Sequence, residues 1–323
     1  MLNSKSGSGG SSRRTNKRRW RRMDTELSLL AAPTFIWFLL FSYLPLAGIL
    51  IAFKDYWARP NMSFWQSLRV SEWNFPDNFE YLFITGDAWL FIFNTLFYNI
   101  IGIVLGMVLP VTVAIILSQL RSKKLMKTSQ TLIFFPHFIS WVVVNQFLFA
   151  FLSHERGFLN NMIESFGGQG VYWYNEPRYW RMILILMNQW KGIGYGSVMY
   201  LASITGIDDT FYEAAMIDGA TKWQQIKNIM LPHLRPMIII LFIMNVGNIF
   251  RTGLDMYYQL PRQSTALYDT YMTIDVYVFN AATGQGNIPQ GSAVGLLQSV
   301  VGLVLVVGAN LIVRKVDPES SLF

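Results

Sequence analysis

Long apolar runs, separated by shorter polar segments, make up most of this chain. Six of the runs approach or exceed the length of about 17–25 residues that an α-helix needs to cross the hydrocarbon of a bilayer. We therefore predict an all-α membrane protein with six transmembrane helices, at 27–53, 88–118, 131–152, 181–205, 236–250 and 292–313. The charged fraction of 14% agrees with this class, because soluble domains carry about 25%.

The lysine and arginine residues indicate which side of the membrane each loop faces. Of the 26, 17 fall on the side that holds both chain ends, and eight fall in the longer loops of the other side. Cytoplasmic loops carry such an excess of positive charge. We therefore predict that both termini lie in the cytoplasm. The net charge of +7 reflects this topology and does not indicate binding to nucleic acid.

The same pattern divides the chain into parts. In order, they are a basic cytoplasmic arm (1–26), the first span with an outer loop (27–87), a core of five spans with a cytoplasmic loop at 206–235 (88–313), and a cytoplasmic tail (314–323). We expect Trp20 and the arginines of the arm to lie against anionic lipid headgroups. The outer loop contains Trp57, Trp65 and Trp73, and we predict that it forms a short interfacial helix and a docking surface.

The chain lacks the residue patterns of a catalytic or metal site. It has no cysteine, and His137, His154 and His233 do not have the spacing of metal ligands. The sequence contains no Ser/His/Asp constellation, no paired carboxylates at membrane depth and no phosphate-binding loop of the G-x-x-x-x-G-K-[ST] type. We therefore predict no catalytic residue, no metal and no cofactor in this chain.

Some polar residues fall within the predicted spans or at their ends. Those predicted to line a translocation pathway are Asn188, Gln189, Lys191, Tyr195, Asn245, Asn248 and Arg251. A lysine about 15 Å into a span costs a few kcal/mol unless it meets water or a partner. Lys191 therefore indicates either a polar cavity or a contact between helices. Gly192, Gly194 and Gly196 permit close packing or local unwinding. For the Asn and Gln residues, hydrogen bonds between helices are the simpler explanation.

The loop between the fourth and fifth predicted spans has helical signals of its own. Asp208 or Asp209 is a good N-cap, and Gly219 suits the position just after a helix end. Thr221 and Gln224 have the spacing of a capping box. The loop is therefore predicted to contain two short helices.

Small and acidic residues on the first of these helices form a candidate interaction surface. The residues of this surface are Glu213, Ala214, Ala215, Asp218 and Gly219. The small ones allow another surface to pack closely, and the carboxylates suit basic groups on a partner. Pro232 and Pro236 are expected to end the second helix and to start the fifth span.

The segment from Glu213 to Pro232 reads Glu-Ala-Ala, three residues, Gly, nine residues, Ile, one residue, Leu-Pro. This spacing resembles the signature of permease subunits of binding-protein-dependent ABC importers. Other motifs resemble the oligosaccharide and polysaccharide subgroup, namely Asn94-Thr95-Leu96, the run from Phe135 to Trp141 (FPHFISW), Trp190-Lys191-Gly192-Ile193-Gly194 and Ala293-Val294-Gly295-Leu296. The resemblance covers roughly 25–320. The subgroup includes importers of uronate oligosaccharides, and the chain is similar to the first permease subunit of an alginate importer.

The resemblance implies the type I, MetI-like permease fold in a bacterial inner membrane. In that family the cytoplasmic loop forms a coupling helix seated in an ATPase. By this resemblance, the residues that would contact the ATPase are Glu213, Ala214, Ala215, Asp218 and Gly219. Two permease subunits form the pathway, two cytoplasmic ATPase subunits hold ATP and Mg, and a periplasmic solute-binding protein delivers cargo. Lys191 and Arg251 suit an anionic oligosaccharide, and Tyr195 is a candidate to stack on a sugar ring.

Two other classes are less favoured by the sequence. A stand-alone secondary sugar carrier would generally need buried carboxylates or matched broken helices, and no Asp or Glu falls inside the predicted spans. A membrane-embedded carbohydrate enzyme would need the catalytic pattern that the sequence lacks.

Overall fold

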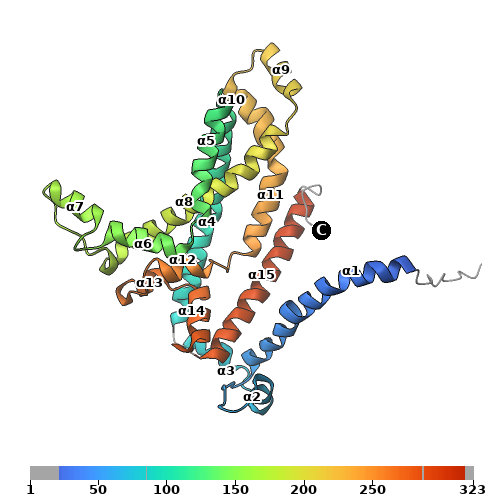
Figure 1. The fold of residues 1–323 in the computed structure, drawn as a ribbon, viewed down its shortest axis with the longest axis vertical. Coiled ribbons are helices and arrows are strands. Elements are labelled where there is room, and N and C mark those ends of the chain that lie inside the picture. Colours follow the sequence, from blue (N-terminus) through green and yellow to red (C-terminus); the bar gives the residue numbers. More distant parts are fainter. Residues whose placement is uncertain (1–21, 85, 286, 317–323) are drawn as a thin grey trace, which may run out of the picture. The chain divides into compact units, whose positions relative to one another are not determined.

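The structure is a computed structural model that describes residues 22–84, 86–285 and 287–316 (Figure 1). The chain separates into two units, Met1–Gly48 and Ile49–Phe323, and each is described by itself. Most of the predicted basic arm and most of the predicted tail lie outside the described residues.

The described part of the first unit is helical. Helix α1 covers Arg22–Phe38, continues through a π-helical turn at Leu39–Tyr43 and enters a 3-10 helix at Leu44–Phe53, which crosses into the second unit. The change to 3-10 bonding begins one residue before Pro45, whose ring nitrogen cannot donate to the α-helical ladder. The first predicted span is therefore helical.

Helices also dominate the second unit. They are α2 (Phe64–Val70), α3 (Asp77–Ile84), α4 (Asp87–Ser118), α5 (Lys123–Phe134), α6 (Trp141–Leu152), α7 (Phe158–Ser165), α8 (Pro177–Thr205), α9 (Asp209–Ile217), α10 (Lys222–Gln225), α11 (Leu231–Gly247), α12 (Leu254–Gln259), α13 (Tyr268–Tyr271), α14 (Ile274–Asn280) and α15 (Ile288–Val316). In the described ranges, β structure is limited to one isolated bridge between Lys54 and Trp73. The prediction of an all-α protein is confirmed.

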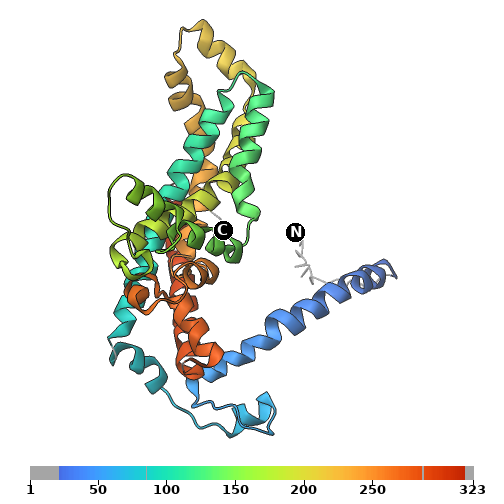
Figure 2. The same ribbon diagram turned by 60° about the vertical axis from the view of Figure 1, so that its left-hand side comes forward.

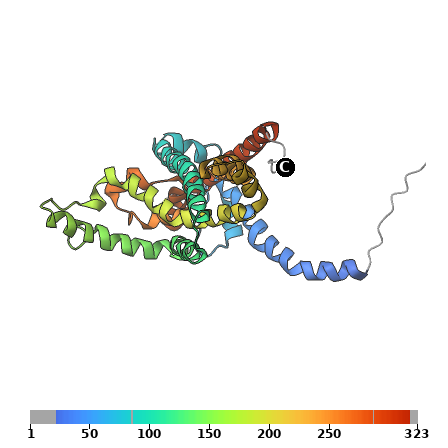
Figure 3. The ribbon, with the colours of Figure 1, turned by 90° about the horizontal axis from the view of Figure 1, so that it is seen from above.

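Figures 1 and 2 show α9 at one end of this unit and α3 with the start of α15 at the other. Seen from the α9 end, α6 and α7 extend sideways from the remaining helices (Figure 3). A short helix is present where one was predicted, as α2, and its place at the membrane interface stays a prediction. Its N-cap Ser63 and Gln66 form a capping box.

Four helical segments within the described residues are long and apolar enough to cross a membrane. They are Thr25–Phe53, Asp87–Ser118, Lys222–Gly247 and Ile288–Lys315, and a bent pair, Lys123–Phe138 with Trp141–Leu152, makes up to five. They include the first, second and sixth predicted spans. The fifth predicted span begins earlier than expected and ends at Gly247. The fourth predicted span lies in α8, which has 29 residues but is too polar to satisfy the same criterion.

The third predicted span is not one straight helix. The two halves meet at an angle of 98° after Phe138. Pro136 lies in a 3-10 turn there, and Ser140 has an extended backbone and caps α6 by accepting a hydrogen bond from the Val143 N–H. The FPHFISW motif is therefore a bend, and the prediction of a continuous helix across it is wrong.

Helix α8 packs along α4 more extensively than any other pair of elements. A Cβ on Gly196 would lie 2.9 Å from the Pro110 side chain of α4, and one on Gly194 would lie 2.7 Å from Phe134 Cα. Both distances are too short for a side chain, so these glycines permit close packing. The alternative expectation of local unwinding is wrong, because α8 is continuous through all three glycines.

The segment from Ile249 to Asn287 was expected to be an outer loop, and the structure packs it into the protein core instead. Met256, Leu260, Leu267 and Val276 are buried in one cluster with side chains of α4, α6 and α8. A backbone that folds irregularly inside a membrane protein must find hydrogen-bond partners in the protein itself.

Helix α4 supplies many of these partners. Asn94 donates to the carbonyl oxygens of Asp269 and Met272, at 3.0 and 2.9 Å. One residue on, Thr95 accepts from the Ile274 N–H at 3.0 Å. Further along, Tyr98 donates to Thr270 O at 2.6 Å and Asn99 to Ile249 O at 2.6 Å. The Asn94-Thr95-Leu96 motif therefore anchors this segment to α4.

Asp275 links the packed segment to α15 by hydrogen bonds. Its Oδ2 accepts from the Thr252 N–H (2.6 Å), the Thr252 hydroxyl (3.0 Å) and the Gly253 N–H (3.2 Å). Its Oδ1 accepts from Gln298 Nε2 of α15 at 2.9 Å, and Gln298 also donates to Phe250 O. One carboxylate thus joins the residues after α11, the start of α14 and α15.

We predict that Asp275→Ala destabilises the protein by about 3 kcal/mol, because several donors lose a charged acceptor. Thermal unfolding in detergent should show a lower midpoint. Asp269→Ala, an exposed acid on the same segment, is the control and should leave the midpoint unchanged. Equal midpoints for both variants would contradict the anchoring role of Asp275.

Candidate functional site

The loop between α8 and α11 begins with a capped helix. Asp208 has an extended backbone, and its Oδ1 accepts from the Thr210 N–H at 2.9 Å, so it is the N-cap of α9. These hydrogen bonds lower the pKa of Asp208 below its ordinary value. The cap is therefore favourable above the unfolded-state pKa of about 3.9 and is lost only as the pH falls through the lowered value.

The other end of α9 is closed by a Schellman motif. Gly219 has φ +78°, and its N–H donates to Met216 O at 3.1 Å. The N–H of Ala220 donates to Ala215 O at 2.8 Å. This is the bonding pattern in which a left-handed residue satisfies the last carbonyl groups of a helix. Both predicted ends of the first short helix are confirmed.

Two aromatic side chains of α9 contact the rest of the protein, while the residues toward its end are exposed. Phe211 lies edge-on to His233, with ring centroids 5.5 Å apart and planes at 63°. Tyr212 packs against the apolar cluster formed by α4, α8 and α11. No residue of α9 is buried, and Phe211, Met216 and Ile217 are exposed, Ile217 by 86%. Glu213, Ala214, Asp218 and Gly219 are exposed beside them, and Ala215 is half-buried. The predicted interaction surface is therefore accessible on a helix whose ends are fixed.

The second short helix is capped as predicted, by Thr221 and Gln224. It does not stop at the prolines, however. A π-helical turn at Ile226–Met230 joins α10 to α11, and Pro232 and Pro236 lie in the first turns of α11. The wider turn shifts the hydrogen-bond register just before Pro232, which is tolerated in a first helical turn. The expectation that these prolines separate two helices is wrong.

The predicted pathway residues on α8 have different surroundings. Gln189 is buried, and Asn188 faces α4, where its Nδ2 would lie 3.7 Å from a Cβ on Gly102. Lys191 places its Nζ 4.3 Å from the Trp141 ring centroid and lies within electrostatic range of Asp255. Lys191 thus has an aromatic neighbour from the bend and an acidic one from the packed segment.

Tyr195 stacks on His137 of the bend, with ring centroids 4.7 Å apart and planes at 14°. Half of its surface is exposed.

The predicted residues near α11 form a second group. Asn245 is exposed, Asn248 donates to Met244 O at 3.0 Å, and Arg251 lies 3.5 Å from Ser299 Oγ. Their lining of a pathway stays a prediction.

Sequence reasoning missed the anchoring side chains Asn94, Thr95, Tyr98 and Asn99. Their spacing of i, i+1, i+4 and i+5 puts all four on one face of a helix. A polar face inside a predicted span was the signal available, because such groups need partners at membrane depth. Asp275 gave no comparable signal, since it lies in a segment that reads as a loop.

A family model, the binding-protein-dependent transport system inner membrane component, matches residues 106–320. This range contains the capped α9, the bend and the packed segment. The chain belongs to this family of permeases.

Two curated relatives come from Bacillus subtilis strain 168. Protein LplB is 34% identical over 303 residues, which are 93% of the permease and 92% of LplB. The polygalacturonan/rhamnogalacturonan transport system permease protein YteP is 34% identical over 298 residues, which are 91% of the permease and 89% of YteP.

Two solved structures are also similar to the permease. One is a bacterial ABC transporter involved in the import of the acidic polysaccharide alginate, with a TM-score of 0.80, 33% identity, and coverage of 91% of the permease and 97% of that chain. The other is a bacterial alginate ABC transporter in complex with an alginate pentasaccharide-bound periplasmic protein. Its TM-score is 0.82 at 33% identity, covering 93% and 98%.

We predict that Gly219→Ala loosens the end of α9, because a Cβ in the left-handed region costs about 1 kcal/mol. Amide hydrogen exchange at Gly219 and Ala220 should become about fivefold faster. Gly206→Ala, at the other end of the same loop, is the control. Gly206 has φ −84°, and a Cβ there would meet only contacts of 3.5 Å or longer. Unchanged exchange in Gly219→Ala would contradict the Schellman assignment.

Proposed function

We propose that this permease is one membrane subunit of an ATP-driven importer that passes an acidic oligosaccharide or polysaccharide from a periplasmic binding protein to the cytoplasm. It pairs with a second permease subunit, and two cytoplasmic ATPase subunits with ATP and Mg drive the cycle. The permease itself has no catalytic activity. The inner membrane is its location, with both termini in the cytoplasm.

The observation that carries the proposal is the construction of α9. Met216 and Ile217 form an exposed apolar face at the end of α9, in a loop outside the apolar spans, whereas Phe211 lies on another side of the helix beside His233. Exposed apolar patches outside the bilayer are typical of protein interfaces. The Asp208 cap and the Gly219 motif keep the helix formed without a partner. We assign this face, with Glu213 to Gly219, to the ATPase.

Tyr212 gives the coupling a physical basis. Its ring belongs to the cluster of Ala114 and Leu117 from α4, Tyr200 from α8 and Leu234 from α11. Packed interiors transmit displacement because they are dense and resist deformation. A shift of α9 imposed by the ATPase would therefore reach three long helices at once.

Two kinds of similarity support an acidic cargo. YteP is a polygalacturonan/rhamnogalacturonan transport system permease, and the two solved structures are of alginate transporters. Each of these polymers carries carboxylates. Lys191 and Arg251 are cations at positions that suit such a cargo, and we propose that they line the pathway together with Asn188, Gln189, Tyr195, Asn245 and Asn248.

We predict that Ile217→Cys becomes protected from a maleimide reagent when the permease assembles with its ATPase. The chain has no other cysteine, so labelling reports this position alone. Phe166→Cys, at an exposed residue just after α7, is the control and should label equally with and without the ATPase. Full labelling of Ile217→Cys in the assembled transporter would refute the docking assignment.

We predict that a mannuronate tetrasaccharide, delivered by the binding protein, stimulates ATP hydrolysis by the assembled transporter more than the neutral mannotetraose does. Lys191→Met keeps a long apolar chain without charge, and it should reduce uptake of the acidic sugar about tenfold. Arg178→Met, an exposed cation at the start of α8, should not. Preference of the wild type for the neutral sugar would overturn the acidic cargo.

A further inference from the structure

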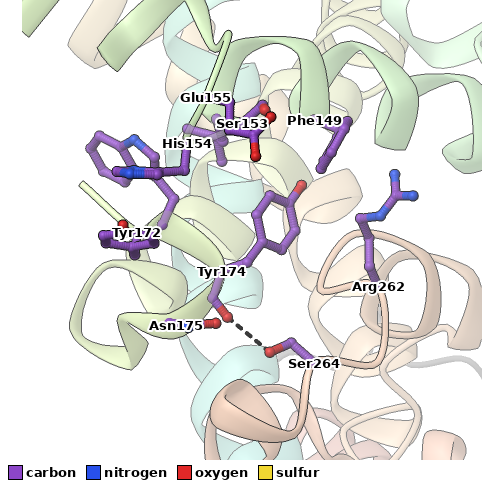
Figure 4. Close-up of a pocket in the computed structure, with 11 residues that line it drawn as sticks. Phe149, Ser153, His154, Glu155, Tyr172, Tyr174, Asn175, Arg262 and Ser264 are labelled. Atoms are coloured by element: carbon purple, nitrogen blue, oxygen red, sulfur yellow. Dashed lines mark hydrogen bonds between the residues drawn. The ribbon is translucent and has the colours of Figure 1, made fainter. Parts of the chain in front are cut away.

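A pocket of about 460 Å³ lies between the segment that joins α6 to α8 and the packed segment (Figure 4). This is within the range of about 300–1,000 Å³ for small-molecule sites. Its lining residues are Phe149, Leu152, Ser153, His154, Glu155, Tyr172, Trp173, Tyr174, Asn175, Arg262 and Ser264. The pocket adjoins the N-terminal end of α8, whereas α9 follows the C-terminal end.

The walls of this pocket are held by hydrogen bonds and ring stacking. Asn160, which is buried, accepts from the Val171 N–H (3.0 Å) and from Trp173 Nε1 (2.9 Å). Tyr172 stacks on His154. Ser264 Oγ donates to Tyr174 O at 2.8 Å and so ties the two sides together (Figure 4). The pocket is therefore formed before anything binds.

Two polar groups in the pocket are left available. The Tyr174 hydroxyl is buried and has no hydrogen-bond partner in the described part of the chain. Burial raises the pKa of Tyr174 to about 12, against a smaller opposing effect of Arg262, so the group remains a donor at neutral pH. An unpaired buried hydroxyl is unfavourable, and an acceptor on a ligand would remove that cost.

Arg262 is the second available group. Its guanidinium lies 4.3 Å from the Phe149 ring centroid. This contact does not use its five N–H donors, and within the described residues they have no hydrogen-bond acceptor. Arg262 and Gln263 have φ +53° and +52°. Non-glycine residues in the left-handed region are often found at functional sites. In Figure 4, Arg262 approaches from the side opposite His154 and Tyr172.

The pocket also contains one acid, Glu155. Figure 4 places it beside Ser153, above the Tyr174 ring and away from Arg262. A ligand that fits both charges must present a carboxylate to Arg262 and hydroxyl donors to Glu155. The aromatic rings of Tyr172, Trp173 and Tyr174 provide flat apolar faces between them. A sugar acid has all of these features, and an acidic peptide side chain lacks the hydroxyl groups.

We infer that this pocket is a second, outer binding site for one uronic acid residue of the cargo. Arg262 pairs with the sugar carboxylate, the Tyr174 hydroxyl donates to a ring or hydroxyl oxygen, and Glu155 accepts from a sugar hydroxyl. The inference rests on the proposed import of an acidic saccharide. It adds a capture site on the permease, separate from the pathway residues of α8 and α11.

The test uses the assembled permease and ATPase complex without the binding protein, so that the sugar site of the binding protein does not contribute. Saturation-transfer NMR measures binding of mannuronate tetrasaccharide and of mannotetraose, which differs by lacking carboxylates. We expect wild type to prefer the acidic sugar. Arg262→Gln should bind it about tenfold more weakly with little change for mannotetraose. Tyr174→Phe should weaken both sugars, and Arg262→Lys should restore part of the preference.

Arg178→Gln is the matched control, because Arg178 is an exposed arginine of the same region outside the pocket. Wild-type binding by Arg262→Gln would overturn the inference. So would normal sugar binding combined with weaker stimulation by the binding protein, which would make the pocket a protein contact. Normal basal ATP hydrolysis in each variant shows that the complex has assembled. If wild type imports no acidic saccharide at all, the proposed function itself fails, whatever Arg262→Gln shows.

Discussion

The structure depends on how an irregular segment is accommodated between long apolar helices. Residues 249–287 contain three short helices joined by turns, and their buried carbonyl and amide groups cannot be left to hydrocarbon. Asn94, Thr95, Tyr98 and Asn99 meet these groups from α4, and Asp275 meets others from within the segment. The polar face of α4 therefore has a structural reason, and its position fixes where the segment lies.

The packed segment and the bend determine which side chains lie next to Lys191, Tyr195 and Phe149. Asp255 comes within electrostatic range of Lys191, and Arg262 reaches Phe149 at the end of α6. The bend before α6 brings Trp141 to Lys191 and His137 to Tyr195. Lys191 and Tyr195 thus have neighbours from the packed segment and the bend, two features that the sequence did not predict.

The sequence predicted what depends on local rules. Helix caps at Asp208, Gly219 and Thr221 follow from backbone donors and acceptors within a few residues, and the structure has all three. Apolar length predicted most of the spans. The bend at 136–140 and the π-helical join before Pro232 could not be read in this way, because proline is compatible with a helix start, a kink and a helix end. Tertiary packing decides among these.

The packed segment was missed for a related reason. Its polar and aromatic residues are individually ordinary for a loop, and only their distant partners on α4 and α15 show that they are buried. For the coupling surface, sequence alone named the residues, and the structure adds that their helix is closed at both ends. For the predicted pathway, the structure gives neighbours for each residue and shows two groups instead of one.

Helix α8 runs from the pocket and the packed segment to the loop that contains α9. Its 29 residues, Pro177–Thr205, span about 43 Å, with Trp180 near the pocket at one end and Ile204 near Tyr212 at the other. If Gly192, Gly194 and Gly196 had unwound the helix, movement at α9 could be absorbed near Lys191. Gly194 and Gly196 instead let α8 pack closely on the end of α5 and on α4 while α8 stays helical. Helix α8 is therefore unbroken from the α9 loop to its start, and Lys191 lies on that continuous helix.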